Sequence, residues 1–109
     1  MKRIPLRPFP GTILLYRNYS AFAKQYRKLT GLAHQGEGAA LGRTVQLAHQ
    51  KKGVNYLVYL KPGNLSTVVH EMAHVCLMLF DDIGTHPAAG KGEPFCYLLD
   101  RLFEEARKK

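Results

Sequence analysis

Three stretches of this chain have the short apolar pattern that is typical of strands. An apolar run over residues 11–16 predicts a first strand. Residues 44–48 and 54–60 are also apolar and flank the polar turn 49–53, so they predict a β-hairpin. Residues 34–38 are rich in glycine and predict a flexible link or a rim loop, without the pattern of a phosphate-binding loop.

Three further stretches have the spacing of helices. Apolar residues recur at helical intervals after a possible cap at Asn18 or Ser20, and Gly31 is placed to end that helix. A second helix is predicted over residues 65–80, and a third begins at Glu93, where an acid and a proline suit the first turn. The predicted inner face of the third helix consists of Phe95, Leu98, Leu99, Leu102 and Phe103.

These elements predict one α+β domain over residues 1–109, with a small antiparallel or mixed sheet. Residues 1–10 hold three prolines and three basic side chains, so they predict an extended basic arm. No uninterrupted apolar stretch reaches the length of a membrane span, and prolines interrupt any signal-peptide core near the start. We therefore expect a cytoplasmic protein without a membrane partner.

The helix over 65–80 carries the strongest chemical signal in the chain. His70 and His74 are four residues apart, so a helix places both rings on one face, where they can bind one tetrahedral ion. Glu71 is one position further round and can reach a water on that ion without being a ligand. This is the general-base position of the His-Glu-x-x-His zinc peptidase motif.

The surroundings of the motif are apolar. Residues 65–80 contain no Pro, no Gly and no charge except Glu71, and this predicts that the helix is buried on nearly every face. Two buried histidines and a buried carboxylate need a metal or a hydrogen-bond network. The alternative to a metal site is a core helix whose histidines are satisfied by hydrogen bonds.

The motif also resembles the extended signature of the zincin metallopeptidases, in which uncharged residues fill the gaps and a Thr or Val lies three positions ahead. Together with 56–62 and 92–99, it looks like a group of small proteins from phage genomes that are assigned as metallopeptidases. The resemblance covers about residues 54–105 and implies a minimal zincin-like domain, placed in the host cytoplasm if the chain comes from a phage. In zincins a strand upstream of the active helix often holds extended peptide, which suggests Tyr56–Leu60 as a substrate-binding edge; an internal strand is the alternative.

A catalytic zinc usually takes three protein ligands, so a third must be found. The metzincin pattern is excluded, because Leu77 and Phe80 occupy its Gly and His positions. Glu93 begins a helix that can pack antiparallel to the first, which resembles the gluzincin arrangement; its alternative role is a favourable charge at a helix N-terminus. Glu93 is therefore the predicted third ligand, chosen from the candidates Asp81, Asp82, His86, Glu93 and Asp100.

The resulting hypothesis is a zinc-dependent metallopeptidase acting on a peptide or protein substrate. Zinc would lower the pKa of a bound water towards ~7, and Glu71 would take its proton and later pass it to the leaving amine. Tyr97 shares a face with Glu93 and could offer its hydroxyl to the oxyanion, although an aromatic residue at helical spacing is usually part of a core. Cys76 and Cys96 are expected to be buried free thiols on separate helices.

The charge is uneven along the chain and supports a second hypothesis. Residues 1–70 carry eleven Lys or Arg against one acid, whereas residues 71–109 carry five against seven, in agreement with the net charge of +8. A basic half can attract nucleic acid or an acidic partner, or serve only solubility. The alternative function is therefore a non-catalytic binding module on the same scaffold, which binds nucleic acid or a host protein.

Overall fold

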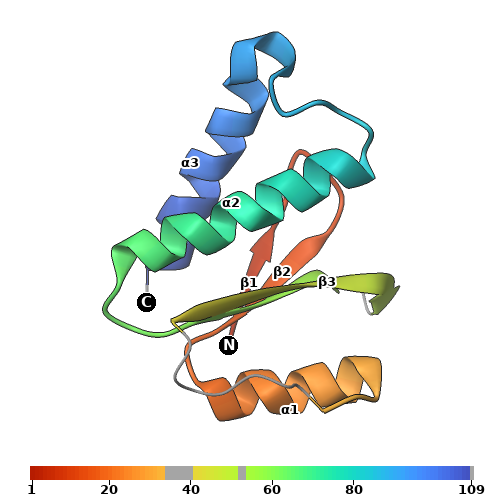
Figure 1. Ribbon diagram of the computed structural model, residues 1–109, viewed down its shortest axis with the longest axis vertical. Helices are drawn as coiled ribbons and strands as arrows, with labels where there is room; N and C mark the ends of the chain where they lie inside the picture. Colours follow the sequence, from red (N-terminus) through yellow and green to blue (C-terminus); the bar gives the residue numbers. More distant parts are fainter. Residues whose placement is uncertain (34–40, 52–53, 109) are drawn as a thin grey trace.

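The computed structural model describes residues 1–33, 41–51 and 54–108, with the side chains of 48–51 left out, and it has an α+β fold (Figure 1). The four strands form one mixed sheet in the order β1-β2-β4-β3, in which β2 and β4 are parallel and the other neighbours are antiparallel. The strands are β1 (Lys2–Pro5), β2 (Thr12–Tyr16), β3 (Gly42–Lys51) and β4 (Val54–Leu60). The helices are α1 (Tyr19–Thr30), α2 (Leu65–Asp82), the short 3₁₀ helix η1 (Ala89–Gly92) and α3 (Glu93–Arg107).

The helices cover both faces of the sheet. In Figure 1, α1 lies on one side of the strands and α2 with α3 on the other. Successive side chains of a strand point to opposite faces, so each strand serves two cores. On the α2 and α3 side, the strands contribute Ile13, Leu15, Tyr56, Val58 and Leu60. On the α1 side, Leu14, Tyr16, Leu57 and Tyr59 pack with Phe22.

Local signals in the sequence predict both ends of α1 correctly. The Asn18 side chain accepts a hydrogen bond from the Ala21 N–H at 2.9 Å, and Gly31 ends α1 with φ of 76°. Asn64 caps α2 in the same way, accepting from the Thr67 N–H at 3.1 Å. The predicted hairpin is confirmed as the antiparallel pair β3 and β4. The predicted link 34–38 lies outside the described residues, as do positions 52–53 of the predicted turn.

The prediction of an extended arm over residues 1–10 is wrong. Residues 2–5 form β1, which pairs antiparallel with β2. Ile4 and Leu6 are fully buried among the core residues, and burial of these two side chains holds the segment against the sheet. Pro5 is tolerated because β1 is an edge strand, where a missing N–H costs little.

The prediction that α2 is buried on nearly every face is also wrong. The sheet and α3 cover part of the helix, and a strip that includes His70, His74 and Leu77 is exposed. An apolar helix gives no sequence signal for which of its faces has no neighbour. The buried residues of α2 are Thr67, Val68, Glu71, Met72, Val75, Cys76, Leu79 and Phe80.

The third helix packs as predicted, and only one of the two thiols is buried. Leu98 and Leu102 are buried, and the other predicted inner residues of α3 pack against the same core. Cys76 is buried, and burial raises the pKa of its thiol to about 12. Cys96 is exposed, because it lies on the open groove between α2 and α3, so its predicted burial is wrong. No helix in the described ranges is long and apolar enough to cross a membrane.

Candidate metal centre

The two histidines of α2 converge on one point in space. Their Nε2 atoms are 3.2 Å apart, and their rings lie edge to face with centroids 4.8 Å apart. Two nitrogens that each lie about 2.05 Å from a tetrahedral zinc are separated by about 3.3 Å. The spacing therefore fits two positions of a zinc site. It also allows one neutral ring to donate its N–H to the other, which is how the pair is satisfied without a metal.

Glu71 is buried beneath this pair and is held by β3. The Thr44 hydroxyl donates a 2.7 Å hydrogen bond to Oε1 of Glu71, and Oε2 lies 3.9 Å from Nε2 of His70. One carboxylate oxygen is thus fixed by the sheet, while the other lies towards the histidines. This is the arrangement expected of a base beside a metal rather than of a third ligand.

Gly42 lets β3 approach the carboxylate closely. A Cβ atom at this position would lie 2.8 Å from Cγ of Glu71 and 3.1 Å from its Oε2, far closer than side chains tolerate. Neither Gly42 nor Thr44 is among the site residues predicted from the sequence. The glycine at the start of β3 is the signal that could have pointed to this place, because a strand glycine often marks a close approach of another group.

The predicted third ligand does not join the pair. Among the described residues, no group of three or more His, Cys, Asp or Glu side chains could hold a metal ion. The third helix packs against α2 but crosses it at a steep angle (Figure 1), with the Phe80 and Phe95 rings in edge contact. The first turn of α3, which holds Glu93, therefore lies near the C-terminal end of α2, where Phe80 is roughly 9 Å along the helix axis beyond His74. Its carboxylate is exposed there.

The remaining candidates are engaged elsewhere or exposed. Asp82 accepts hydrogen bonds from the Tyr56 hydroxyl at 2.9 Å and from the Gln46 amide at 2.7 and 2.8 Å, so it ties the end of α2 to the sheet. His86 accepts from the Ala88 N–H at 3.0 Å in the following loop. Asp81, Asp100 and Tyr97 are exposed, and the Tyr97 side chain is 70% exposed.

An open apolar groove runs beside the histidines, between α2 and α3. Two of its lining residues lie close to His70 on α2. Ser66 is four residues before His70 and therefore on the same face of the helix, and Val69 directly precedes His70 in the sequence. The groove has a volume of about 490 Å³, enough for one or two side chains of a bound chain. It is lined by Leu65, Ser66, Val69, Cys96, Leu99, Asp100 and Phe103.

The prediction of a substrate-binding edge at Tyr56–Leu60 is wrong, and its alternative, an internal strand, is confirmed. Tyr56–Leu60 belongs to β4, which lies between β2 and β3 and has both of its edges paired. The strand that carries Gly42 and Thr44 is β3, which lies at the edge of the sheet and packs on α2. Comparisons with models of protein families, with curated proteins and with solved structures give no match for this chain.

Proposed function

We propose that this protein is a zinc-dependent metallopeptidase with a minimal zincin-like fold. His70 and His74 are the proposed zinc ligands, and Glu71 is the proposed general base. The observation that carries the proposal is the 3.2 Å separation of the two Nε2 atoms together with a carboxylate oxygen 3.9 Å from one of them. A helix core that needed only satisfied histidines would not require Glu71 beneath them.

The residues of the chain supply proton transfer and orientation. A zinc ion at the pair would polarise a peptide carbonyl and lower the pKa of a water nearby. Glu71 takes the proton of the attacking water through the oxygen that Thr44 leaves available, and it returns the proton to the leaving amine. Thr44 keeps the carboxylate in one orientation during both transfers, since a fixed base needs no reorganisation at each step.

Glu93 remains the proposed third ligand, and it must move to reach the pair. The turn before α3 contains Gly90 and Gly92, with φ of 61° and 79°, followed by the exposed first turn of the helix. A rearrangement of this turn would have to carry the carboxylate towards His74. Zinc binding would supply the free energy for that movement, because a ligand shifts a protein towards the conformation that binds the ligand more tightly.

The outer edge of β3, which pairs with no other strand among the described residues, is the proposed place for an extended peptide. Backbone hydrogen bonds can add a strand to such an edge. A peptide bound there would lie beside the strand whose Gly42 and Thr44 contact Glu71. The groove between α2 and α3 would then accept an apolar side chain on the far side of the histidines.

Metal content and cleavage test this proposal together. Protein purified without chelator, and apo protein titrated with zinc, should each contain one zinc per chain by elemental analysis. The loaded protein should cleave an unstructured polypeptide, and a chelator should stop the cleavage. Failure to bind zinc at micromolar concentration near neutral pH would contradict the metal site.

The second candidate is a non-catalytic module that binds nucleic acid or an acidic host protein. It is favoured by the net charge of the first seventy residues, in which eleven cations stand against one acid. Zinc binding without cleavage of any polypeptide, together with salt-dependent binding to DNA or RNA, would support this function over the peptidase.

A further inference from the structure

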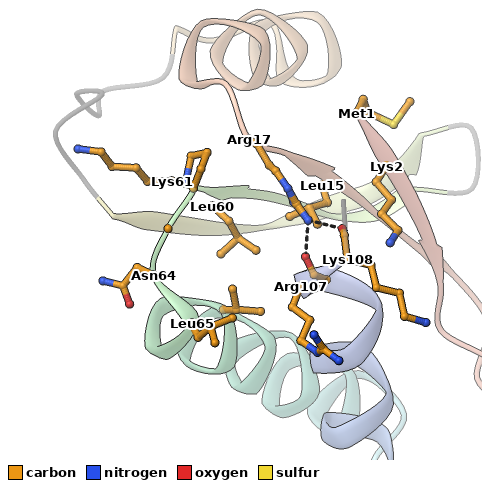
Figure 2. Close-up of a pocket in the computed structure, with 14 residues that line it drawn as sticks. Met1, Lys2, Leu15, Arg17, Leu60, Lys61, Asn64, Leu65, Arg107 and Lys108 are labelled. Atoms are coloured by element: carbon orange, nitrogen blue, oxygen red, sulfur yellow. Dashed lines mark hydrogen bonds between the residues drawn. The ribbon is translucent and has the colours of Figure 1, made fainter.

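A second cavity lies at the opposite end of α2 from Glu93, around the loop that joins β4 to α2 (Figure 2). Its volume is about 650 Å³, within the range of roughly 300–1,000 Å³ that is usual for small-molecule sites. We call it the β2–β4 cavity. It is lined by Met1, Lys2, Leu15, Arg17, Leu60, Lys61, Pro62, Gly63, Asn64, Leu65, Val68, Ala106, Arg107 and Lys108.

The topology of the sheet creates this cavity. Because β2 and β4 are parallel neighbours, their carboxyl ends meet at one edge of the sheet. The chain then leaves β2 for α1 on one face and leaves β4 for α2 on the other face (Figure 1). Parallel strands whose following helices diverge in this way leave a crevice beyond their ends, and open α/β sheets commonly bind ligands there.

The rim of the β2–β4 cavity carries a net positive charge. Five cationic side chains line it, and no lining residue in the described part of the chain is acidic. Lys2 and Lys108 share Glu105 as an ion-pair partner, at 3.9 and 3.4 Å, and Arg107 pairs with Glu104 at 2.8 Å, so two neighbouring carboxylates offset part of this charge. Lys61 forms no ion pair within the described ranges. The five cations are Lys2, Arg17, Lys61, Arg107 and Lys108.

The rim is held in place by the backbone of α3. The Arg17 guanidinium donates to the carbonyl oxygens of Ala106 and Lys108, each at 2.6 Å, and Lys2 donates to the carbonyl oxygen of Glu105 at 2.6 Å. These bonds satisfy carbonyls that a helix C-terminus leaves without partners. They also place two cations at the mouth of the cavity without the entropic cost of ordering them when a ligand binds.

The floor of the cavity is apolar. Leu15, Leu60 and Val68 are almost fully buried, and Leu65 is exposed at its side. In Figure 2, Leu60 and Leu65 face the same space, with Arg17 and Arg107 on its other side. A fully hydrated inorganic ion gains nothing from contact with apolar side chains. A ligand with both an anionic and an apolar part can contact the cations of the rim and the leucines of the floor at once.

We propose that the β2–β4 cavity binds an amphipathic organic anion, with its phosphate or carboxylate group against the cationic rim and its apolar body on the leucine floor. This site is separate from the candidate metal centre. Val68 lines the cavity from the buried side of α2, and His70 lies about 200° further round the helix, on the exposed side.

Octyl phosphate is the probe that tests the site, with octanoate, 1-octanol and inorganic phosphate as comparisons. We expect octyl phosphate to bind saturably by calorimetry, with amide chemical-shift changes confined to residues that line the cavity and their neighbours, in segments 1–2, 15–17, 60–68 and 106–108. We expect octanoate to bind at the same residues, and the stronger of the two identifies the preferred head group. We expect both to bind at least tenfold more tightly than 1-octanol or inorganic phosphate.

Charge-reversal variants provide a matched control. Lys61→Glu should weaken binding of octyl phosphate at least tenfold. Lys91→Glu, which makes the same change in net charge at the far end of α3, should change it less than twofold. Leu65→Ser, at an exposed position, should weaken octyl phosphate but not inorganic phosphate.

Four results would overturn the proposal. Three of them are unsaturable binding, equal loss in Lys61→Glu and Lys91→Glu, and equal affinity for octyl phosphate and inorganic phosphate. The fourth is loss of binding in His70→Ala protein treated with chelator, since that would assign the anion to a metal at the histidines. If the protein binds octyl phosphate in this way but binds no zinc, the anion site is supported and only the proposed metal site fails.

Discussion

Neighbouring residues of α2 have different chemical roles, and substitution can separate them. His74→Ala removes a proposed ligand, so zinc affinity should fall, together with the stability that zinc binding adds to the folded state. Glu71→Gln keeps the shape of the side chain and both histidines, so zinc should stay bound while hydrolysis falls by about 10²–10⁴-fold. Zinc content, thermal melts with and without chelator, and a cleavage assay measure these effects. Loss of zinc in Glu71→Gln equal to that in His74→Ala would make Glu71 a ligand and contradict the mechanism.

Thr44 has a positioning role that its own variants can test. Thr44→Val keeps the shape of the side chain but removes the hydroxyl that donates to Oε1 of Glu71 at 2.7 Å. A carboxylate free to rotate spends less time in the productive orientation, so we expect kcat to fall by roughly tenfold with KM and zinc content unchanged. Thr44→Ser restores the hydroxyl and should recover most of kcat. Equal activity of Thr44→Val and the unsubstituted protein would exclude this role.

At the scale of elements, the edge strand β1 contributes to the stability of the fold through its buried side chain Ile4. Ile4 is 1% exposed and packs in the core between the sheet and the helices. Ile4→Ala should lower the free energy of unfolding by about 2 to 5 kcal/mol, the usual cost of such a truncation. Arg3→Ala, at the exposed neighbouring position, is the matched control and should cost little. If denaturant melts give the same free energy of unfolding for the two variants, β1 does not contribute to the core and residues 1–10 are better described as an extended arm.

The contact between α2 and β4 makes stability depend on pH in the alkaline range. Burial raises the pKa of the Cys76 thiol from 9.0 to about 12, against an opposing effect of Arg101, and burial with a hydrogen bond to Asp82 raises that of Tyr56. Both groups are neutral in the folded state and ionise more readily when unfolded. Their stabilisation is therefore complete below about pH 9 and is lost as the pH rises from there towards 12.

Denaturant melts between pH 8 and 11 measure this loss. The free energy of unfolding should decline over that range, and Cys76→Ala should make the decline less steep, whatever its effect on stability at pH 7. Cys96→Ala changes an exposed thiol and should leave the slope unaltered. An unchanged slope in Cys76→Ala would contradict the buried thiol as a cause.

Local signals in the sequence predict where the helices and strands are. They do not predict which elements pack against one another in the fold. Asn18, Gly31 and Asn64 act within one helical turn, so a short window of sequence contains all the information that places the helix ends. The position of β4 inside the sheet depends on pairing with β2, which lies some forty residues earlier, and no local pattern records that pairing. The same reason explains the exposed strip of α2, since periodicity identifies apolar faces but not which of them is covered.

At the scale of the whole molecule, part of the candidate site can be predicted from the sequence and part cannot. His70, Glu71 and His74 come from one helical turn, so their spacing predicts their geometry. Gly42 and Thr44 complete the setting of Glu71 from a strand that is close only in the folded chain. The β2–β4 cavity is assembled from both ends of the chain and two strand ends, and it has no signature in any single stretch.

Glu93 tests whether the two helices close around a metal. In the structure its carboxylate does not join the histidines, so a zinc-bound structure should show the first turn of α3 displaced and a carboxylate oxygen about 2.0 to 2.2 Å from zinc. Glu93→Gln should then lower zinc affinity by a factor comparable to His74→Ala. Asp100→Asn, which neutralises an exposed acid two turns later on α3, should leave the affinity unchanged. Because the ligand must be brought in by movement, α3 should also gain protection from hydrogen exchange when zinc binds. Full zinc affinity in Glu93→Gln would assign the third position to another group and end the gluzincin assignment, while the pair and Glu71 would keep their roles.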